Sequence, residues 1–202
     1  MAKTVEFHFD FGSPNAYLSH KLIPDIEKRT GATFKYVPVL LGGVFKLTNN
    51  ASPIVQFKDV QHKLAYQRLE MERFIRKHGL TRFRQNPHFP VNTVQIMRGA
   101  VAAEMDGKLA PYVEVVYRAM WEDGLKMDDP AVIKSALDAG GIDGARILAR
   151  IQEQDVKDAL LKNTEGSVAR GTFGSPMFYV GDEPFFGKDR LRDVEEAIAG
   201  GK

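Results

Sequence analysis

The sequence predicts an α/β fold with a large all-helical domain inserted into it. Three observations point to this class. A strand-like alternation opens the chain at Val5–Phe11, helical periodicity dominates residues 56–162, and strand signals return only near residues 176–187. Strands at both ends of a chain with helices between them fit one α/β domain that the helices interrupt.

The first forty or so residues predict a βαβ unit. Apolar side chains at odd positions from Val5 to Phe11 alternate with polar ones, which is the period of a β-strand. We expect a helix from about Pro14 to Arg29, because Ser13 is a favourable N-cap and proline suits the first turn. Gly31 is a typical end for that helix. Thr33–Leu41, rich in β-branched and aromatic residues, predicts a second, parallel strand.

The middle of the chain follows the helical period. Gly42-Gly43 and Asn49–Pro53 mark a loop, after which apolar residues recur three and four positions apart. The clearest run is Tyr112, Val115, Val116, Ala119 and Met120. Asp129-Pro130 and Asp143 predict the starts of further helices.

The chain ends in a strand, a turn, a second strand and a helix. Pro176–Val180 is strand-like, Gly181-Asp182 forms the turn, Glu183–Gly187 is the hairpin partner, and Asp189–Ala199 is the closing helix. We therefore divide the chain into two domains. The first combines residues 1–50 and 166–202, and the second, inserted and helical, is residues 51–165.

The composition excludes several classes of protein. The 202 residues carry a net charge of only +2, and no recognition motif accompanies it, so we expect no nucleic-acid partner. No apolar run approaches the roughly 20 residues that span a membrane. The absence of cysteine excludes disulfides and thiolate metal sites, and it fits a cytoplasmic protein. The five histidines lack metal-ligand spacing, so we predict no metal site.

Ser13 is the candidate catalytic residue. It lies just past the first strand, at the start of a helix, where a hydroxyl and free amide groups favour an anion. Taken alone, Ser13 is more simply explained as a helix cap. Because the chain has no cysteine, chemistry through sulfur would require a small-molecule thiol.

Three motifs carry a family resemblance: Phe9–Pro14, Gly174-Ser175-Pro176 before a strand, and Phe186–Leu191 before a helix. Together, over nearly the whole length, they resemble a thioredoxin-superfamily group. This group comprises 2-hydroxychromene-2-carboxylate isomerases and kappa-class glutathione transferases, and the opening and ending are more similar to the isomerases. The resemblance implies a thioredoxin-like domain with the inserted helical domain. In redox relatives a cysteine begins the first helix and is one member of a redox pair. Here Ser13 and Ala16 replace both members of that pair.

The resemblance also implies glutathione as cofactor, a small aromatic keto acid as substrate and a homodimer. Ser13 would hold the glutathione sulfur as a thiolate, and the Ser175 backbone, before a cis Pro176, would pair with the cysteinyl part. The matched turn around the γ-glutamyl end consists of Phe186, Gly187, Lys188, Asp189 and Arg190. Asn50 would join the cofactor site, and Lys46 and Asn92 the substrate site.

The activity that this resemblance implies is cis–trans isomerisation in naphthalene-type aromatic catabolism. The enzyme would interconvert 2-hydroxychromene-2-carboxylate and trans-o-hydroxybenzylidenepyruvate through transient addition of the thiolate. Two alternatives stay open: a kappa-type transferase that releases a glutathione conjugate, and a non-catalytic thioredoxin-like binding module. Asn15, Ser175 and Phe185-Phe186 depart from common family residues, which leaves the shape of the second-substrate pocket undecided.

Overall fold

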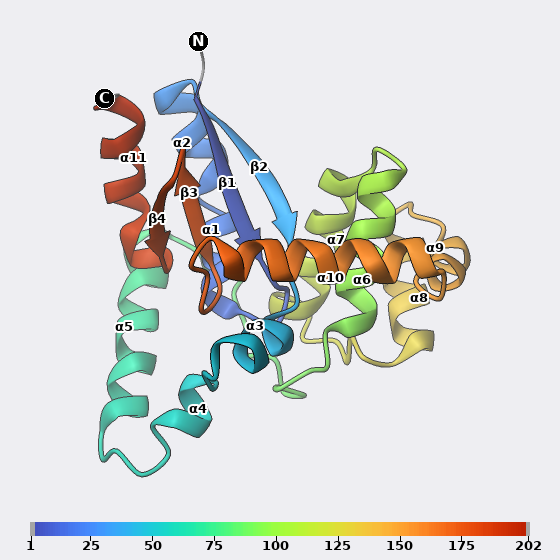
Figure 1. The fold of residues 1–202 in the computed structure, drawn as a ribbon. Helices are drawn as coiled ribbons and strands as arrows, with labels where there is room; N and C mark the ends of the chain where they lie inside the picture. The colour runs from blue at the N-terminus through green and yellow to red at the C-terminus, as the bar shows by residue number, and fades with distance from the viewer. Residues whose placement is uncertain (1–2, 201–202) are drawn as a thin grey trace.

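A four-stranded mixed sheet organises the computed structural model, which describes residues 3–200 (Figure 1). The strands are β1 (Thr4–Phe9), β2 (Thr33–Pro38), β3 (Met177–Val180) and β4 (Glu183–Phe186). Their order is β2-β1-β3-β4, with β1 and β2 parallel and both other pairs antiparallel. The predicted parallel βαβ unit and the C-terminal hairpin are therefore confirmed, and the two ends of the chain share one sheet.

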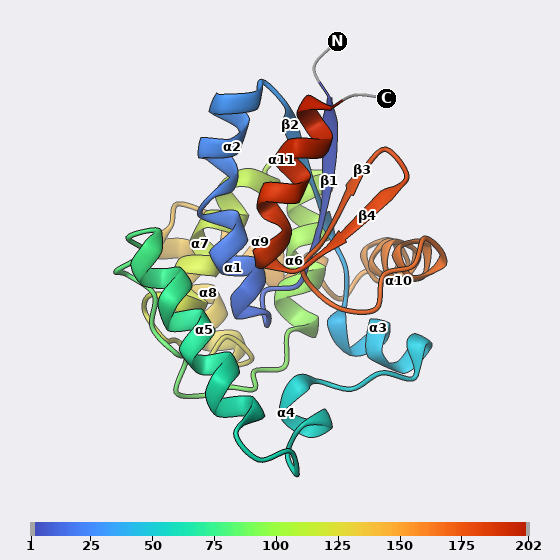
Figure 2. The same ribbon diagram turned by 90° about the vertical axis from the view of Figure 1, so that its left-hand side faces the viewer.

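Helices cover both faces of this sheet (Figure 2). On one face lie α2 (Ile23–Thr30) and α11 (Leu191–Ala199), which pack against each other and against the strands. On the other face lies α10 (Gln154–Ala169). The closing helix begins as a short 3-10 turn, η1 (Lys188–Arg190), directly before α11. This arrangement confirms the predicted thioredoxin-like fold class.

The helix expected from Pro14 to Arg29 is interrupted. It consists of α1 (Pro14–His20) and α2, with Lys21 and Leu22 between them. The cause is Pro24, which has no N–H to donate to the His20 carbonyl and whose ring clashes with a continuous helix. Gly31 ends α2 with φ of 70°, as expected for a glycine cap.

Gly42-Gly43 was expected in a loop, and this expectation is wrong. Both glycines lie inside α3 (Leu41–Thr48). The N–H groups of Leu40 and Leu41 at the helix start donate to Thr164 Oγ1 at 3.0 Å and Asp10 Oδ2 at 2.7 Å. A side chain at Gly43 would come within 3.1 Å of the Thr164 methyl group, so this glycine permits close packing of α3 on α10.

The predicted helical segment is helical throughout most of its length. Its helices before α10 are α4 (Pro53–Gln56), α5 (Lys63–Lys77), α6 (Val94–Met105), α7 (Leu109–Trp121), α8 (Pro130–Ala139) and α9 (Gly144–Arg150). The side chains of Asp129 and Asp143 cap α8 and α9 as expected. The domain boundary predicted at residue 166 falls inside α10, and the division into two domains remains a prediction. Among residues 3–200, no helix is both long and apolar enough to cross a bilayer.

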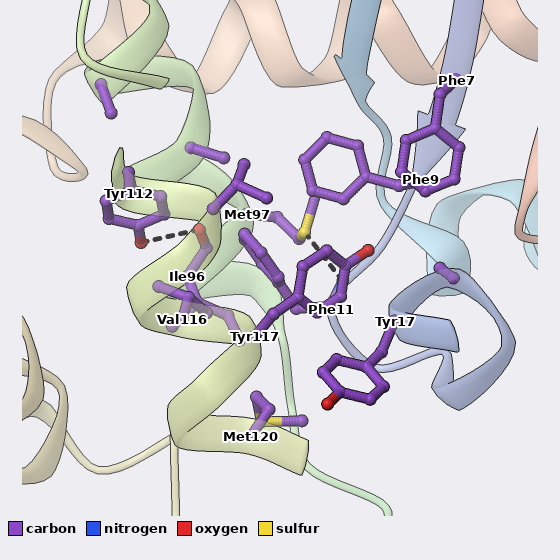
Figure 3. Close-up of a cluster of buried hydrophobic side chains, with 14 of the residues drawn as sticks. Phe7, Phe9, Phe11, Tyr17, Ile96, Met97, Tyr112, Val116, Tyr117 and Met120 are labelled. Carbon is purple, nitrogen blue, oxygen red and sulfur yellow. Dashed lines mark hydrogen bonds between the residues drawn. The ribbon is translucent and has the colours of Figure 1, made fainter. Parts of the chain in front are cut away.

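The core joins the sheet to the helical segment (Figure 3). Phe7, Phe9 and Phe11 are fully buried and form a row of aromatic rings that continues into Tyr117 on α7, whose centroid lies 4.8 Å from that of Phe11. The five residues of the clearest helical run, from Tyr112 to Met120, are all buried. Because one cluster of buried side chains spans both parts, the loop after β1 lies between sheet and helices.

Candidate active site

Ser13 caps α1 and also reaches across the fold to Ser175. Its Oγ accepts a hydrogen bond from the Ala16 N–H at 3.2 Å and donates one to the Ser175 carbonyl oxygen at 3.0 Å. The side chain is only 5% exposed. The predicted helix cap is confirmed, and the structure brings together two site residues that are 162 positions apart in the sequence. Because α1 has only seven residues, these local donors and acceptors, rather than a long helix dipole, define the environment of Ser13.

Ser175 is held from both sides. Its Oγ accepts a hydrogen bond from the Asp10 backbone N–H at 3.2 Å, while its carbonyl oxygen accepts the one from Ser13. The peptide bond to Pro176 is cis, as predicted. The Gly187 N–H donates to the Pro176 carbonyl at 3.0 Å, which links this turn to the end of β4.

Asp10 connects three parts of the molecule and was given no role in the sequence analysis. Its buried carboxylate accepts hydrogen bonds from the Gly12 N–H, the Leu41 N–H and the Thr93 hydroxyl at 2.8, 2.7 and 3.1 Å. Burial raises the pKa of Asp10, although these three donors oppose the shift. A charged residue at the end of a predicted buried strand is the signal that could have identified it. Asp10 therefore sets the direction in which the chain leaves β1 toward Ser13.

The helical segment fixes the same loop. Trp121 Nε1 on α7 donates to the Phe11 carbonyl at 2.8 Å, and the Phe11 N–H points at Met97 Sδ on α6 at 3.4 Å. Both Trp121 and Met97 are fully buried. The inserted helices consequently hold the backbone that carries Ser13.

The turn before α11 forms a second polar cluster. Lys188 is only 5% exposed, and its Nζ lies 2.6 Å from Asp189 Oδ1 and 4.7 Å from the ring centroid of Phe74 on α5. Both residues line a cavity of about 290 Å³ between α2, α5 and α11. Gly187 has φ of 92°, a conformation that favours glycine. Arg190 instead points along the helix, 3.6 Å from Asp193.

Phe186 and Asn50 both border the loop that carries Ser175. The Phe186 ring is 45% exposed, and its centroid lies 4.6 Å from that of Phe173. Asn50 Nδ2 donates to the Phe173 carbonyl at 2.9 Å. A side chain at Gly174 would collide with the Phe186 ring at 2.8 Å, so the glycine permits this packing.

Each of the two predicted substrate residues belongs to a segment that donates a hydrogen bond to Asp10. Lys46 is exposed on α3, the helix whose first N–H binds Asp10. Asn92 precedes Thr93, another partner of Asp10, and its Oδ1 accepts the Val94 N–H at 3.1 Å. Within the described part of the chain, no hydrogen bond joins Lys46 or Asn92 to Ser13 or Ser175.

A larger hollow of about 500 Å³ lies elsewhere, between α7 and α8, and none of the predicted site residues lines it. Residues 3–200 contain no group of three or more histidine, aspartate or glutamate side chains placed to share a metal ion. The polar cluster around Ser13, Ser175 and Asp10 therefore remains the candidate site.

The family described as the DSBA-like thioredoxin domain matches residues 4–199. The chain belongs to this family. A 2-hydroxychromene-2-carboxylate isomerase from Pseudomonas putida is 27% identical over 96% of this chain and 93% of that protein. A kappa 1 glutathione S-transferase from Caenorhabditis elegans is 21% identical over 96% of this chain and 90% of that protein. The predicted resemblance to both subgroups is confirmed.

The fold of this DSBA-like protein also matches a solved 2-hydroxychromene-2-carboxylate isomerase. The two share 25% sequence identity with a TM-score of 0.83, and the match covers 98% of this chain and 95% of the other. The similarity therefore includes the inserted helices as well as the sheet.

Proposed function

We propose that the protein is a glutathione-dependent cis–trans isomerase of aromatic catabolism. It interconverts 2-hydroxychromene-2-carboxylate and trans-o-hydroxybenzylidenepyruvate. The observation that carries this proposal is the hydroxyl of Ser13, directed at the Ser175 carbonyl at 3.0 Å in a chain without cysteine. The similarity to isomerases over nearly the full length supports the choice of reaction.

The groups at the site suit the chemistry of glutathione. The Ser13 hydroxyl is a donor for a thiolate, and the backbone at Ser175 continues into β3 as a strand does, which suits the cysteinyl part of the tripeptide. The Asp189 side chain is 70% exposed and presents a carboxylate to the ammonium of the γ-glutamyl end, next to the Lys188 ammonium. Phe186, Gly187, Arg190 and Asn50 complete the proposed cofactor site.

Ser13 acts by changing its hydrogen-bond acceptor. Its O–H, which donates to the Ser175 carbonyl, turns toward the sulfur and keeps the Ala16 N–H as donor to its oxygen. A hydrogen bond to a charged group contributes about 1.5–3 kcal/mol, against about 0.5–1.5 kcal/mol for a neutral one. The difference lowers the pKa of a thiol, ordinarily about 8.5, by roughly one unit, since one unit equals about 1.4 kcal/mol.

When bound, glutathione supplies the sulfur nucleophile whose reversible addition to a conjugated double bond permits rotation about that bond. Lys46 orients the substrate's carboxylate by charge, and Asn92 donates to the developing oxyanion through its amide. Neither Ser13 nor any other residue of the chain forms a bond to carbon. We also propose a homodimer, as the family resemblance implies, and a cytoplasmic location, which the absence of cysteine fits.

Titration calorimetry with glutathione, followed by an isomerase assay, tests the proposal. We expect saturable binding, turnover that consumes no glutathione, and a bound thiol whose pKa is about one unit higher in Ser13→Ala than in the parent protein. Ser19→Ala, which removes a buried hydroxyl within the same helix, is the matched control and leaves that pKa unchanged. Absence of glutathione binding, or an unaltered thiol pKa in Ser13→Ala, contradicts the proposal.

A second candidate function is a kappa-type transferase, which the similarity to the nematode enzyme favours. Mass spectrometry after turnover distinguishes the two activities, because a transferase accumulates a glutathione conjugate and an isomerase does not.

A further inference from the structure

A buried chain of hydrogen bonds runs from β1 to the loop that carries Ser175. His8 Nδ1 lies 2.7 Å from Ser167 Oγ, Ser167 Oγ lies 2.7 Å from Thr172 Oγ1, and Thr172 Oγ1 lies 2.8 Å from the Tyr179 hydroxyl. The Tyr179 hydroxyl donates to the Arg170 carbonyl at 3.2 Å. The four linked side chains are at most 3% exposed. The chain therefore joins β1, the end of α10 and β3 away from water.

This chain of hydrogen bonds holds both ends of a short loop. Residues 170–176 connect α10 to β3 and contain Ser175 next to the cis Pro176. Arg170 accepts the last hydrogen bond at the start of this loop, and Thr172, two residues later, is the middle of the chain. At the far end of the loop, Met177 pairs with His8 itself in the sheet. A change in these contacts displaces the backbone that leads to Ser175.

Counting protons shows which form of His8 the geometry requires. Four contacts in the chain need four protons, and the three hydroxyls of Ser167, Thr172 and Tyr179 supply three. The fourth must come from His8 Nδ1. His8 Nε2 lies 3.0 Å from Glu6 Oε2 and needs a proton for that contact as well. Only the imidazolium protonates both ring nitrogens. The Glu6 carboxylate is a stronger acceptor than the Ser167 hydroxyl, so neutral His8 keeps its proton on Nε2, and the contact between Nδ1 and Ser167 then lacks the proton that the chain needs.

We propose that His8 is a positioning residue for Ser175, and that its protonated form completes the chain and fixes the loop in the geometry that binds glutathione. This inference rests on the proposed function only for the identity of the ligand. It predicts that the site binds the tripeptide more tightly when His8 is charged.

Several charged groups around His8 set where it titrates. Glu6 lies on its own strand, the Arg170 guanidinium binds Glu6 and lies 4.0 Å from the Tyr179 ring centroid, and Lys35 on β2 is a further positive charge. Burial lowers the pKa of His8 from its ordinary value of 6.5, while Glu6 opposes this shift. The change in binding therefore belongs below about pH 6.5.

Binding of S-methylglutathione to the full-length protein between about pH 5 and about pH 7 tests the proposal. This probe has no ionisable sulfur, and its carboxyl groups stay ionised over the range. We expect the parent protein to bind it about fivefold more tightly at the lower pH, the equivalent of one ordinary hydrogen bond. In His8→Asn, an amide nitrogen replaces Nδ1 as a permanent donor, so we expect the affinity to be independent of pH. Asp10, which directly follows β1, is retained in this variant.

Amide hydrogen exchange of residues 171–175 in the ligand-free protein gives a second readout. After correction for intrinsic exchange, we expect more protection at the lower pH in the parent protein and no pH dependence in His8→Asn. Thr172→Val, which interrupts the chain beyond His8, lowers the protection at both pH values.

The two readouts separate the failure of this inference from that of the proposed function. If S-methylglutathione does not bind at any pH but the protection changes as expected, the proposed function is wrong and the role of His8 in fixing the loop stands. Binding and protection that do not change with pH in the parent protein, or a pH dependence that persists in His8→Asn, overturn the inference.

Discussion

The loop after β1 and the segment from α4 to the first half of α5 differ in how much of the fold holds them. In the loop, Asp10 and Phe11 are fully buried, and partners come from α3, α6, α7 and the loop before β3. In the segment, neither α4 nor α5 contains a fully buried residue. Five of its large apolar side chains are 38–60% exposed: Ile54, Val55, Val60, Tyr66 and Leu69. Folding free energy is therefore concentrated around the backbone of Ser13.

The largest expected effect comes from Trp121, which connects the helices to that loop. Trp121→Phe removes the hydrogen bond to the Phe11 carbonyl and leaves this buried acceptor without a partner. The smaller phenylalanine ring also leaves part of a fully buried site unfilled. We expect the free energy of unfolding to fall by about 3 kcal/mol in urea denaturation. Met120→Leu, a volume-conserving change at the neighbouring buried position, should cost less than about 1.5 kcal/mol. Equal losses in the two variants would mean that the hydrogen bond does not hold the loop.

Asp10→Asn is expected to cost about 2 kcal/mol. The amide of asparagine keeps one acceptor oxygen, but its NH₂ group replaces the other oxygen. This NH₂ group then faces an N–H or O–H donor that the carboxylate had accepted from, and neither donor has an acceptor. Asp59→Asn is the matched control, because the Asp59 side chain is 88% exposed, and it should change the stability by less than about 0.5 kcal/mol.

The pH dependence of Asp10→Asn has a definite sign. Because burial raises the pKa of Asp10 above 3.8, the folded state binds a proton there more readily than the unfolded state. Asp10 therefore makes the parent protein more stable as the pH falls from the pKa of Asp10 in the folded state toward its ordinary pKa of 3.8. The asparagine variant lacks this gain, so its deficit widens in acid. A deficit that narrows over this range would contradict the assignment.

Glu114 on α7 gives a smaller effect with the opposite sign. Its contact with His20 on α1, at 3.0 Å, lowers the pKa of Glu114 to about 2. The stability that Glu114 contributes is complete above about pH 4.5 and is lost as the pH falls toward about 2. Because the side chain is 57% exposed, we expect only about 1 kcal/mol after solvent screening.

Denaturation of Glu114→Gln at pH values above and below this window checks the contribution. We expect a deficit relative to the parent protein above the window and none below it. Glu165→Gln, an exposed carboxylate on α10, is the control and should show no such difference. A deficit that does not change with pH would assign the effect to packing instead of charge.

Local patterns predicted the elements whose residues decide their own conformation. The alternation at Val5–Phe11, the cap at Ser13 and the hairpin after Pro176 are of this kind. Sequence reasoning went wrong at α3, where Gly43 serves close packing on Thr164, a neighbour more than a hundred residues away. The break between α1 and α2 was local, and Pro24 was the signal that should have shown it.

The residues of the candidate site also fall into two groups, those that the sequence predicted and those that it did not. The pairing of Ser13 with Ser175 followed from family motifs, because spacing alone does not bring residues 162 positions apart together. Asp10 and His8 were read only as the polar positions of an alternating strand. Their partners, on α3, at the N-cap of α6 and on α10, are brought to β1 by the tertiary fold, and no periodicity in the sequence encodes these contacts.

The smallest expected effect belongs to the exposed segment and sharpens the contrast with the loop. Val55 on α4 is 60% exposed, whereas Val116 on α7 is fully buried in the aromatic core. The same change, valine to serine, should cost less than about 0.5 kcal/mol at Val55 and about 3 kcal/mol at Val116, where it removes apolar contacts and buries a hydroxyl. Urea denaturation of the two variants measures the difference directly. Because both sites are helical and the substitution is identical, helix propensity cancels to first order. A loss at Val55 approaching that at Val116 would mean that α4 contributes to the folded core, and the distinction between the two regions would not hold.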